Sequence, residues 1–348
     1  MSSAPTAFKT WLAQLATGAS LTEAEAEAAF DMMMSGDATP SQMGAFLMAM
    51  RVRGETVAEI TGAARAMRAR ALQVRAPDDA IDTCGTGGDG GGTFNISTAA
   101  SFVIAACGVP VAKHGNRNLS SRSGSADVLA ALGVNIEAPL DVIERAIAEV
   151  GIGFMMAPRH HSATRHVGPT RVELGTRTIF NLLGPLSNPA GVKRQVVGVF
   201  AREWVRPVAE VLQRLGSTAC WVVHGDGLDE LTTTGINTVA RLKDGVIKEI
   251  AFEVDELGLP SARREDLAGG APEENAAMMR ALFAGERGPI RDVVLLNAAA
   301  ALLVAGRCLS LADGLDRAAA ALDSGRAGQV LEQLVAFTTA PARTISLP

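Results

Sequence analysis

The first 75 or so residues carry the apolar spacing of short amphipathic helices. One predicted helix begins at Thr39-Pro40 and ends at Gly54. Its apolar face consists of Met43, Phe46, Leu47 and Met50. Two more helices begin with the capping boxes Thr22/Glu25 and Thr56/Glu59. Because short helices of this kind need a surface to pack on, we expect a small helical domain that rests on the rest of the chain.

After residue 77 the pattern changes to short β-branched runs that alternate with helical segments. The candidate strands are 80–83, 109–112, 134–136, 152–156, 195–200 and 219–224. The candidate helices are 97–107, 125–132, 140–150, 204–215 and 293–305. Four of these helices should end at glycines, namely Gly108, Gly133, Gly151 and Gly216. Such alternation predicts a mostly parallel sheet covered by helices.

The predicted fold is therefore α/β with two domains. Residues 1–77 form a small all-α domain, and residues 78–167 and 192–348 form a large α/β domain around a mostly parallel central sheet. The Gly- and Pro-rich stretch 168–191 interrupts the strand–helix rhythm, and we expect it to cross back to the small domain.

Composition narrows the class of protein. The 348 residues suffice for a sizeable core, and a formal net charge of −5 gives no basic surface for nucleic acid. No apolar run reaches membrane-spanning length, and the N-terminus lacks the pattern of a signal peptide. The four cysteines are widely spaced, which favours reduced thiols. We expect a cytoplasmic protein with no nucleic-acid or membrane partner.

A glycine-rich run follows the first candidate strand. Residues 85–92 contain six glycines, and Asn95, Ser97 and Thr98 stand at the start of the next helix. Exposed backbone N–H groups beside a helix N-terminus are typical of a phosphate site. The run also satisfies the dinucleotide fingerprint, but no Asp or Glu lies between Asp89 and Asp127 to hold a ribose, so we reject that interpretation. A Walker A sequence is excluded because the chain contains no Gly-Lys dipeptide.

A second polar segment follows the second candidate strand. It begins with Lys113-His-Gly-Asn-Arg117 and continues through serines up to Ser125. Open α/β sheets bind ligands at the carboxyl ends of their strands, so these groups could hold another phosphate. The alternative is a solvated polar turn. Two such loops together suggest a ligand with two separate phosphate groups.

Other polar residues give weaker signals. Asp229 and Glu230 follow a candidate strand and are candidate Mg²⁺ ligands, although acidic pairs are also common on surfaces. The histidines His160, His161 and His166 lack zinc-ligand spacing, so we interpret them as plain loop residues. No base stands near Cys84 in the sequence, which favours a packing role for that thiol.

Arg171 and Arg177 are placed on a predicted helix beside the Gly/Pro-rich crossover. An arginine fork can hold a carboxylate through two hydrogen bonds. The alternative for either arginine is an ordinary surface pair with Glu173.

These motifs together resemble the anthranilate phosphoribosyltransferase family. The matching segments are Gly85-Thr-Gly-Gly-Asp89, Asn95-Ile-Ser-Thr98, Lys113-His-Gly-Asn-Arg117, Gly168-Pro-x-Arg171, Arg177-Thr-Ile-Phe-Asn-x-Leu-Gly-Pro-Leu186 and Gly227-Leu-Asp-Glu230. The resemblance implies a fold of the nucleoside phosphorylase and phosphoribosyltransferase type and a homodimer formed through the helical parts. It also implies anthranilate and phosphoribosyl pyrophosphate (PRPP) as substrates, with Mg²⁺, in tryptophan biosynthesis.

The resemblance further implies site residues. Those around PRPP are Gly85, Gly88, Asp89, Thr93, Asn95, Ile96, Ser97, Thr98, Lys113, His114, Gly115, Asn116, Arg117, Asn118, Leu119, Ser120, Ser121 and Ser125. Those around anthranilate are Gly85, Asn116 and Arg171, and the Mg²⁺ ligands are Ser97, Asp229 and Glu230. One departure is His161-Ser-Ala-Thr-Arg165, where the family usually has His-Pro-Ala-Met-Lys. This departure concerns the anthranilate entrance, and thus the preference for the aromatic acid.

The chemistry implied needs positioning and charge stabilisation, and we assign no residue as a general base. A pyrimidine nucleoside phosphorylase is the nearest rival, but such enzymes typically carry Ser-Thr-Gly-Gly-Val-Gly-Asp and Lys-x-Ser-x-Arg elements that differ from this chain. A non-catalytic nucleic-acid-binding relative would be expected to lose the loop residues and gain a basic face. Here the loop residues are intact and the chain is acidic.

Overall fold

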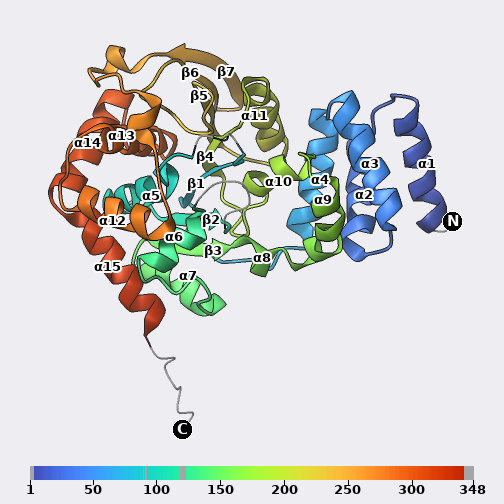
Figure 1. The fold of residues 1–348 in the computed structure, drawn as a ribbon, viewed down its shortest axis with the longest axis horizontal. Coiled ribbons are helices and arrows are strands. Elements are labelled where there is room, and N and C mark those ends of the chain that lie inside the picture. The colour runs from blue at the N-terminus through green and yellow to red at the C-terminus, as the bar shows by residue number, and fades with distance from the viewer. Residues whose placement is uncertain (1–3, 89, 91, 118–122, 341–348) are drawn as a thin grey trace, which may run out of the picture.

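The computed structural model describes residues 4–88, 90, 92–117 and 123–340. A small helical unit stands beside a larger unit built around one sheet (Figure 1). This arrangement is the predicted α/β fold class with a helical N-terminal part. Within the described ranges, no helix combines the length and the apolar character needed to cross a membrane.

The small unit begins with helices α1 (Ala4–Ala16), α2 (Glu23–Ser35), α3 (Pro40–Arg53) and α4 (Val57–Ala69). The stretch expected to cross back supplies two further helices. One is α9 (Gly168–Leu174), which contacts α3, and the other is α10 (Phe180–Leu186), which contacts α4. Thr22, Thr39 and Thr56 cap α2, α3 and α4, each in a capping box, so the predicted helix starts are confirmed.

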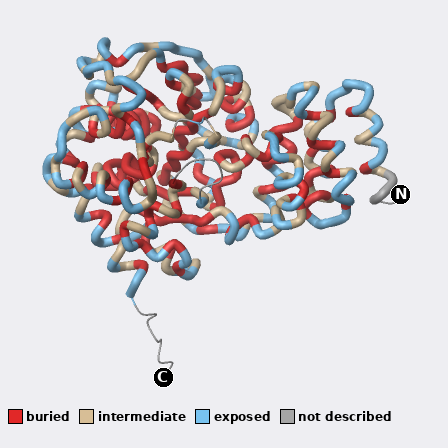
Figure 2. Tube along the Cα trace, viewed as in Figure 1, coloured by how far each residue is buried: buried red, intermediate tan, exposed pale blue. Residues whose placement is uncertain are grey.

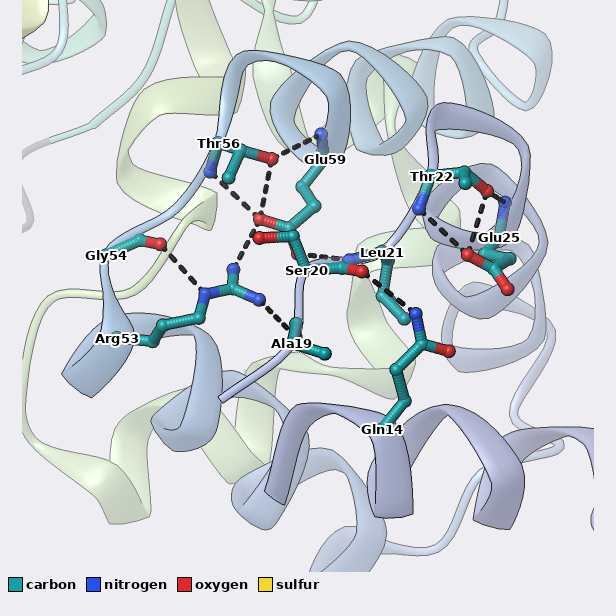
Figure 3. A network of polar contacts seen from close by, with 10 residues as sticks. All are labelled: Gln14, Ala19, Ser20, Leu21, Thr22, Glu25, Arg53, Gly54, Thr56 and Glu59. Carbon is teal, nitrogen blue, oxygen red and sulfur yellow. Dashed lines mark hydrogen bonds and ion pairs between the residues drawn. The ribbon is translucent and has the colours of Figure 1, made fainter. Parts of the chain in front are cut away.

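One of these capping boxes does more than begin a helix. The Glu59 side chain is fully buried and accepts hydrogen bonds from the backbone N–H groups of Thr56 and Leu21, both at 2.9 Å. It also forms an ion pair with Arg53, whose guanidinium donates to the Ala19 carbonyl (Figure 3). The carboxylate thereby joins the end of α3, the start of α4 and the loop before α2.

Replacing Glu59 with alanine is expected to lower the free energy of unfolding by about 3–5 kcal/mol, because Arg53 and two buried N–H groups lose their partner. The matched control is Glu25→Ala, which removes a less buried capping-box glutamate bonded to Thr22 and should cost about 1 kcal/mol. Urea unfolding followed by circular dichroism measures both. Equal losses for the two variants would contradict the structural role given to Glu59.

The large unit contains a seven-stranded sheet with the order β3-β2-β1-β4-β5-β6-β7. Its strands are β1 (Ile81–Gly85), β2 (Val111–Gly115), β3 (Ile152–Met156), β4 (Arg194–Gly198), β5 (Ala219–Gly225), β6 (Asn237–Lys243) and β7 (Val246–Phe252). The strands β1 to β5 pair in parallel, whereas β6 and β7 are antiparallel. The prediction of a mostly parallel sheet is confirmed.

One sequence expectation about the strands is corrected, and one pair of strands was missed. Residues 134–136 form a turn between helices, where Val134 and Ile136 are buried in a helix-covered core and the Asn135 N–H donates to Thr338 Oγ1. Their apolar alternation reflects packing and not strand pairing. The β6–β7 hairpin was not predicted. Its turn residues, Asp244 and Gly245, both have positive φ, the usual requirement of a two-residue hairpin turn, and the Asp-Gly dipeptide was the sequence signal for it.

Helices cover both faces of the sheet. They are α5 (Ile96–Ala106), α6 (Ser125–Ala131), α7 (Leu140–Glu149), α8 (Ala157–His160), α11 (Val205–Arg214), α12 (Pro272–Phe283), α13 (Pro289–Val304), α14 (Leu311–Asp323) and α15 (Arg326–Thr339). Short 3₁₀ helices are η1 (Ser162–His166), η2 (Arg202–Trp204), η3 (Val254–Leu257) and η4 (Arg264–Leu267). The five predicted helices are confirmed within a few residues, and all four predicted terminal glycines have positive φ.

Strand β5 shows how the two faces differ. Val223 belongs to the core formed with α5 and α13, while its neighbour Val222 belongs to the core shared with α4, α10 and α11. The buried interior therefore continues from the sheet into the helical unit (Figure 2). This continuity holds α9 and α10 beside the carboxyl ends of the strands, where the candidate site lies.

Candidate functional site

Two adjoining cavities lie at the carboxyl ends of β1, β2 and β5. The polar cavity contains about 1070 Å³ of empty space and the apolar cavity about 890 Å³, open solvent included in both. Gly85, His114, Gly115, Asn116 and Asn181 are among the residues that line both cavities. A two-part ligand, or two ligands that react with each other, could therefore meet at these shared residues.

The structure gathers most of the predicted PRPP residues around the polar cavity. They are Gly85, Gly88, Thr93, Asn95, Ile96, Ser97, Thr98, Lys113, His114, Gly115, Asn116, Arg117 and Ser125. The predicted residues Asp89, Asn118, Leu119, Ser120 and Ser121 lie outside the described residues. The cavity brings together segments that are separated by up to 146 residues in the chain, from Cys84 to Glu230.

The start of α5 lines this cavity and has no side-chain cap. Asn95 is the N-cap residue, but its side chain does not cap the helix. Its Oδ1 accepts hydrogen bonds from Asn275 Nδ2 at 2.8 Å and from Ser123 Oγ at 3.2 Å. Asn95 therefore joins α5, the second polar loop and α12. Its side chain does not cover the helix start, where the Ile96 N–H donates to the Phe94 carbonyl at 2.7 Å and the Ser97 N–H donates to Glu230.

Lys113 differs from its expected place in the loop after the second strand. It lies within β2, is 2% exposed, and its Nζ donates to the Thr83 carbonyl at 2.7 Å. Burial lowers the pKa of Lys113, while the negative charge of Asp82 opposes that shift. The ammonium thus forms part of the cavity wall at the strand level, with one donor already engaged.

The acidic pair closes the polar cavity from the side of β5. Asp229 Oδ2 accepts a hydrogen bond from the Gly87 N–H at 2.7 Å, and Glu230 Oε1 accepts one from the Ser97 N–H at 3.1 Å. Burial raises the pKa of Glu230 to about 8, and the adjacent Asp229 adds to the shift. Two carboxylates that disfavour each other's charge form an environment that a divalent cation would relieve.

The oxygen ligands around this pair are of the kind that Mg²⁺ uses together with a substrate phosphate. Oxygen ligands are available from Asp229, Glu230 and the Ser97 hydroxyl. Within the described ranges no group of three or more His, Cys, Asp or Glu side chains could hold a metal. Since Mg²⁺ typically uses one or two carboxylates together with substrate phosphates and water, this set suits an ion that enters with a phosphorylated substrate.

The apolar cavity lies between the sheet and the two crossover helices. Arg171 on α9 and Phe180 on α10 line it, and the Arg171 guanidinium carbon lies 5.2 Å from the Phe180 ring centroid. Arg171 forms no ion pair with any described carboxylate, so the alternative of a surface pair with Glu173 is wrong. A half-buried guanidinium beside an aromatic ring suits a planar aromatic carboxylate.

Arg177 is not on the same helix as Arg171, contrary to the sequence expectation. Helix α9 ends at Leu174, and Gly175 takes a left-handed conformation there with φ of 58°. Arg177 therefore lies in the connection to α10 and points away from the apolar cavity, toward Gly88 and Phe200. The two arginines have different surroundings.

The histidines were expected to be plain loop residues. His161 does lie in the loop between α8 and η1, whereas His160 ends α8 and His166 lies in η1. His160 and His161 are both buried, and the His161 ring lies 5.1 Å from the His114 ring, centroid to centroid. Burial lowers the pKa of His161 to about 4, with a further contribution from His160. Burial also places the pKa of His114 well below its usual value. No spacing signal in the sequence indicates this pair, because the two residues come from different elements.

The low pKa of buried His161 predicts that the free energy of unfolding depends on pH. The folded pKa of His161 lies below the unfolded value near 6.5, so the stabilising neutral form is kept above pH 6.5 and lost as the pH falls toward 4. The free energy of unfolding should fall by about 3 kcal/mol over that window from this residue. His161→Gln should reduce the slope measured by urea unfolding, whereas the less buried His166→Gln should leave it unchanged. The same slope in both variants would contradict this account.

Cys84 lines both cavities but has no nucleophilic character. It is buried, and burial together with the negative charge of Asp82 raises the pKa of its thiol well above the usual value. The prediction of a packing role is confirmed.

Comparisons with known proteins agree with this geometry. The chain matches the "Glycosyl transferase family, helical bundle domain" over residues 9–71 and the "Glycosyl transferase family, a/b domain" over residues 77–328. It is 64% identical to the anthranilate phosphoribosyltransferase of Azospirillum brasilense over 96% of this chain and 94% of that one. It is 61% identical to the enzyme of the same name from Rhodospirillum rubrum, over 96% and 97% of the two chains.

Solved structures are similar as well. The anthranilate phosphoribosyltransferase of Thermus thermophilus superposes with a TM-score of 0.90 at 47% identity, covering 94% of this chain and 99% of that one. The enzyme of that name from Saccharomyces cerevisiae, in complex with PRPP and Mg, gives a TM-score of 0.87 at 27% identity over 95% and 97% of the chains. A complex of that yeast enzyme with 4-fluoroanthranilate gives 0.86 at 26% identity, over 97% and 98%.

Proposed function

The chain belongs to the anthranilate phosphoribosyltransferase family, and from that premise we propose how its two cavities divide the reaction. The protein transfers the phosphoribosyl group of PRPP to the amine of anthranilate, giving N-(5-phosphoribosyl)anthranilate and pyrophosphate in tryptophan biosynthesis. The polar cavity takes PRPP and the apolar cavity takes anthranilate. The observation that carries this division is that the two cavities adjoin at Gly85 and Asn116, residues that line both.

PRPP is held mainly by backbone N–H groups and hydroxyls. The glycines after β1 and the start of α5 offer amide donors, and the Ser97, Thr98 and Ser125 hydroxyls line the same cavity. Lys113 contributes positive charge from the cavity wall. Ser97, Asp229 and Glu230 would hold Mg²⁺, and the bound ion would supply positive charge to balance the leaving group.

Anthranilate is held by Arg171 and the surrounding apolar wall. The Arg171 guanidinium binds the carboxylate, while Met67, Pro158 and Phe180 exclude water from the ring. The amine then faces Gly85 and Asn116, where the polar cavity begins. Bond formation between the amine nitrogen and C1 of the ribose accompanies cleavage of the C1–O bond to pyrophosphate, and the nitrogen releases one proton. We assign no residue as the base, and attribute the rate to positioning and electrostatics.

We also propose a homodimer formed through the helical unit. Val52 on α3 is 82% exposed and Val172 on α9 is 81% exposed, and these two helices contact each other. Large apolar side chains on adjoining helices of one unit are a feature of protein interfaces. A cytoplasmic location is supported by four cysteines that are all free.

The reaction is tested by mixing the protein with Mg²⁺, PRPP and anthranilate and following the loss of anthranilate fluorescence. One pyrophosphate should be released for each anthranilate consumed, and EDTA should stop the reaction. Parallel mixtures with thymidine and phosphate test a nucleoside phosphorylase, and a DNA gel shift at physiological salt tests a nucleic-acid-binding relative. Activity in either parallel assay with none on anthranilate would overturn the proposal.

A further inference from the structure

The described part of the glycine loop is held on one side by the sheet. The Thr86 N–H donates to the Gly198 carbonyl at 3.0 Å, and Thr86 Oγ1 accepts from the Phe200 N–H at 3.0 Å. Gly198 is the last residue of β4, and Phe200 follows it by two residues. These bonds fix the first turn of the loop to the large unit.

The next residues of the loop depend on side chains from elsewhere. The Gly87 N–H donates to Asp229, and the Gly88 carbonyl accepts from Arg177 Nη2. Both glycines have positive φ, 66° and 77°. Because glycine adopts positive and negative φ about equally well, contacts with other residues must hold the loop in this conformation. A Cβ at Gly88 would lie 3.4 Å from the Arg177 guanidinium, so the side chain packs directly on the loop backbone.

Arg177 is itself fixed by an aromatic ring. Its guanidinium carbon lies 4.4 Å from the centroid of the Phe200 ring, and the Phe200 N–H is the donor to Thr86. Arg177 forms no ion pair with a carboxylate of the described ranges. It therefore touches the loop directly at Gly88, which lines the polar cavity, and indirectly through Phe200.

The segment that carries Arg177 connects two helices that line the other cavity. These are α9, which bears Arg171, and α10, which bears Phe180 and Asn181. The Thr178 N–H donates to Asn181 Oδ1 at 3.0 Å, and Asn181 lines both cavities. One short connection thus forms the apolar cavity with its helices and supports the glycine loop with its arginine.

From this geometry we infer that Arg177 is a positioning residue for PRPP: it holds Gly88 and Phe200 so that the glycine loop presents its N–H groups to the pyrophosphate. The inference rests on the proposed function, since it assigns a role within the PRPP site. Arg177 does not touch the reacting atoms in this account. It affects the affinity for PRPP through the loop, and it lies in the connection between the two helices that line the apolar cavity.

The test compares Arg177→Met, Arg177→Lys and Phe200→Leu with the wild type. We expect Arg177→Met to raise the Kd for PRPP with Mg²⁺, measured by titration calorimetry, on the order of tenfold. Its KM for PRPP should rise by a similar factor, while kcat and the KM for anthranilate stay within about twofold. Arg177→Lys should recover only part of the affinity, because an ammonium lacks the planar face that stacks on Phe200. Phe200→Leu should give an intermediate loss.

Arg202→Met is the matched control, since Arg202 is an exposed arginine two residues after Phe200 and should bind PRPP as the wild type does. An unchanged PRPP Kd in Arg177→Met overturns the inference. A parallel rise of the KM for anthranilate, or a lowered melting temperature without a change in PRPP affinity, also overturns it, because either indicates a merely structural role. If the wild type itself gives no heat with PRPP and Mg²⁺, the proposed function fails instead.

Discussion

Replacing Asp229 and Glu230 together with asparagine and glutamine is expected to lower kcat by about a thousandfold at millimolar Mg²⁺. The amide oxygens can still accept from the Gly87 and Ser97 N–H groups, so the loops should keep their positions. What is lost is the negative charge that attracts the cation and thereby balances the pyrophosphate. Steady-state loss of anthranilate fluorescence over a range of Mg²⁺ concentrations measures the effect.

Asp226→Asn is the matched control for this double variant. Asp226 lies three residues before the pair and is exposed, and its carboxylate accepts a hydrogen bond from Thr234 Oγ1. Its neutralisation should change kcat by less than about twofold, since surface charges of this kind contribute little. Wild-type turnover of the double variant at the same Mg²⁺ concentration would show that the carboxylates do not hold the metal.

Replacing Arg171 with methionine is expected to raise the KM for anthranilate on the order of a hundredfold, which is the loss of a charge-assisted, bidentate contact of about 2.7 kcal/mol. The KM for PRPP should change by less than about twofold, because Arg171 lines the apolar cavity and not the polar one. Methionine keeps much of the packing on Phe180, so the cavity should remain formed.

Two further variants serve as a conservative replacement and as a control in this second experiment. Arg171→Lys keeps the charge but loses the planar fork, and should recover only part of the anthranilate affinity. Arg202→Met removes an exposed arginine of η2 that lines neither cavity, and should leave both KM values unchanged. Equal increases of the two KM values in Arg171→Met would remove Arg171 from the anthranilate site.

Within the predicted site, the sequence was most informative where function depends on a single segment. The glycine run and the start of α5 are contiguous, so their pattern alone indicates a phosphate site. The acidic pair was a weak signal, because adjacent carboxylates are common in sequences. Only the folded structure shows that the two carboxylates accept hydrogen bonds from the Gly87 and Ser97 N–H groups. The roles given to all these residues stay predictions until the variants are measured.

Although it did not indicate α12, α14 or α15, the sequence by itself determined the ends of most of the predicted helices, the mostly parallel character of the sheet and the position of the glycine loop. These depend on capping, periodicity and glycine conformation, which act between residues a few positions apart. Only the tertiary structure decided that residues 134–136 pack as a turn, that Lys113 lies within a strand, and that His161 meets His114. It also separated Arg171, which lines the apolar cavity, from Arg177, which contacts the glycine loop at Gly88. At these positions the burial and the charged neighbours are provided by segments far apart in the chain. A local sequence pattern does not indicate which distant segments will be in contact.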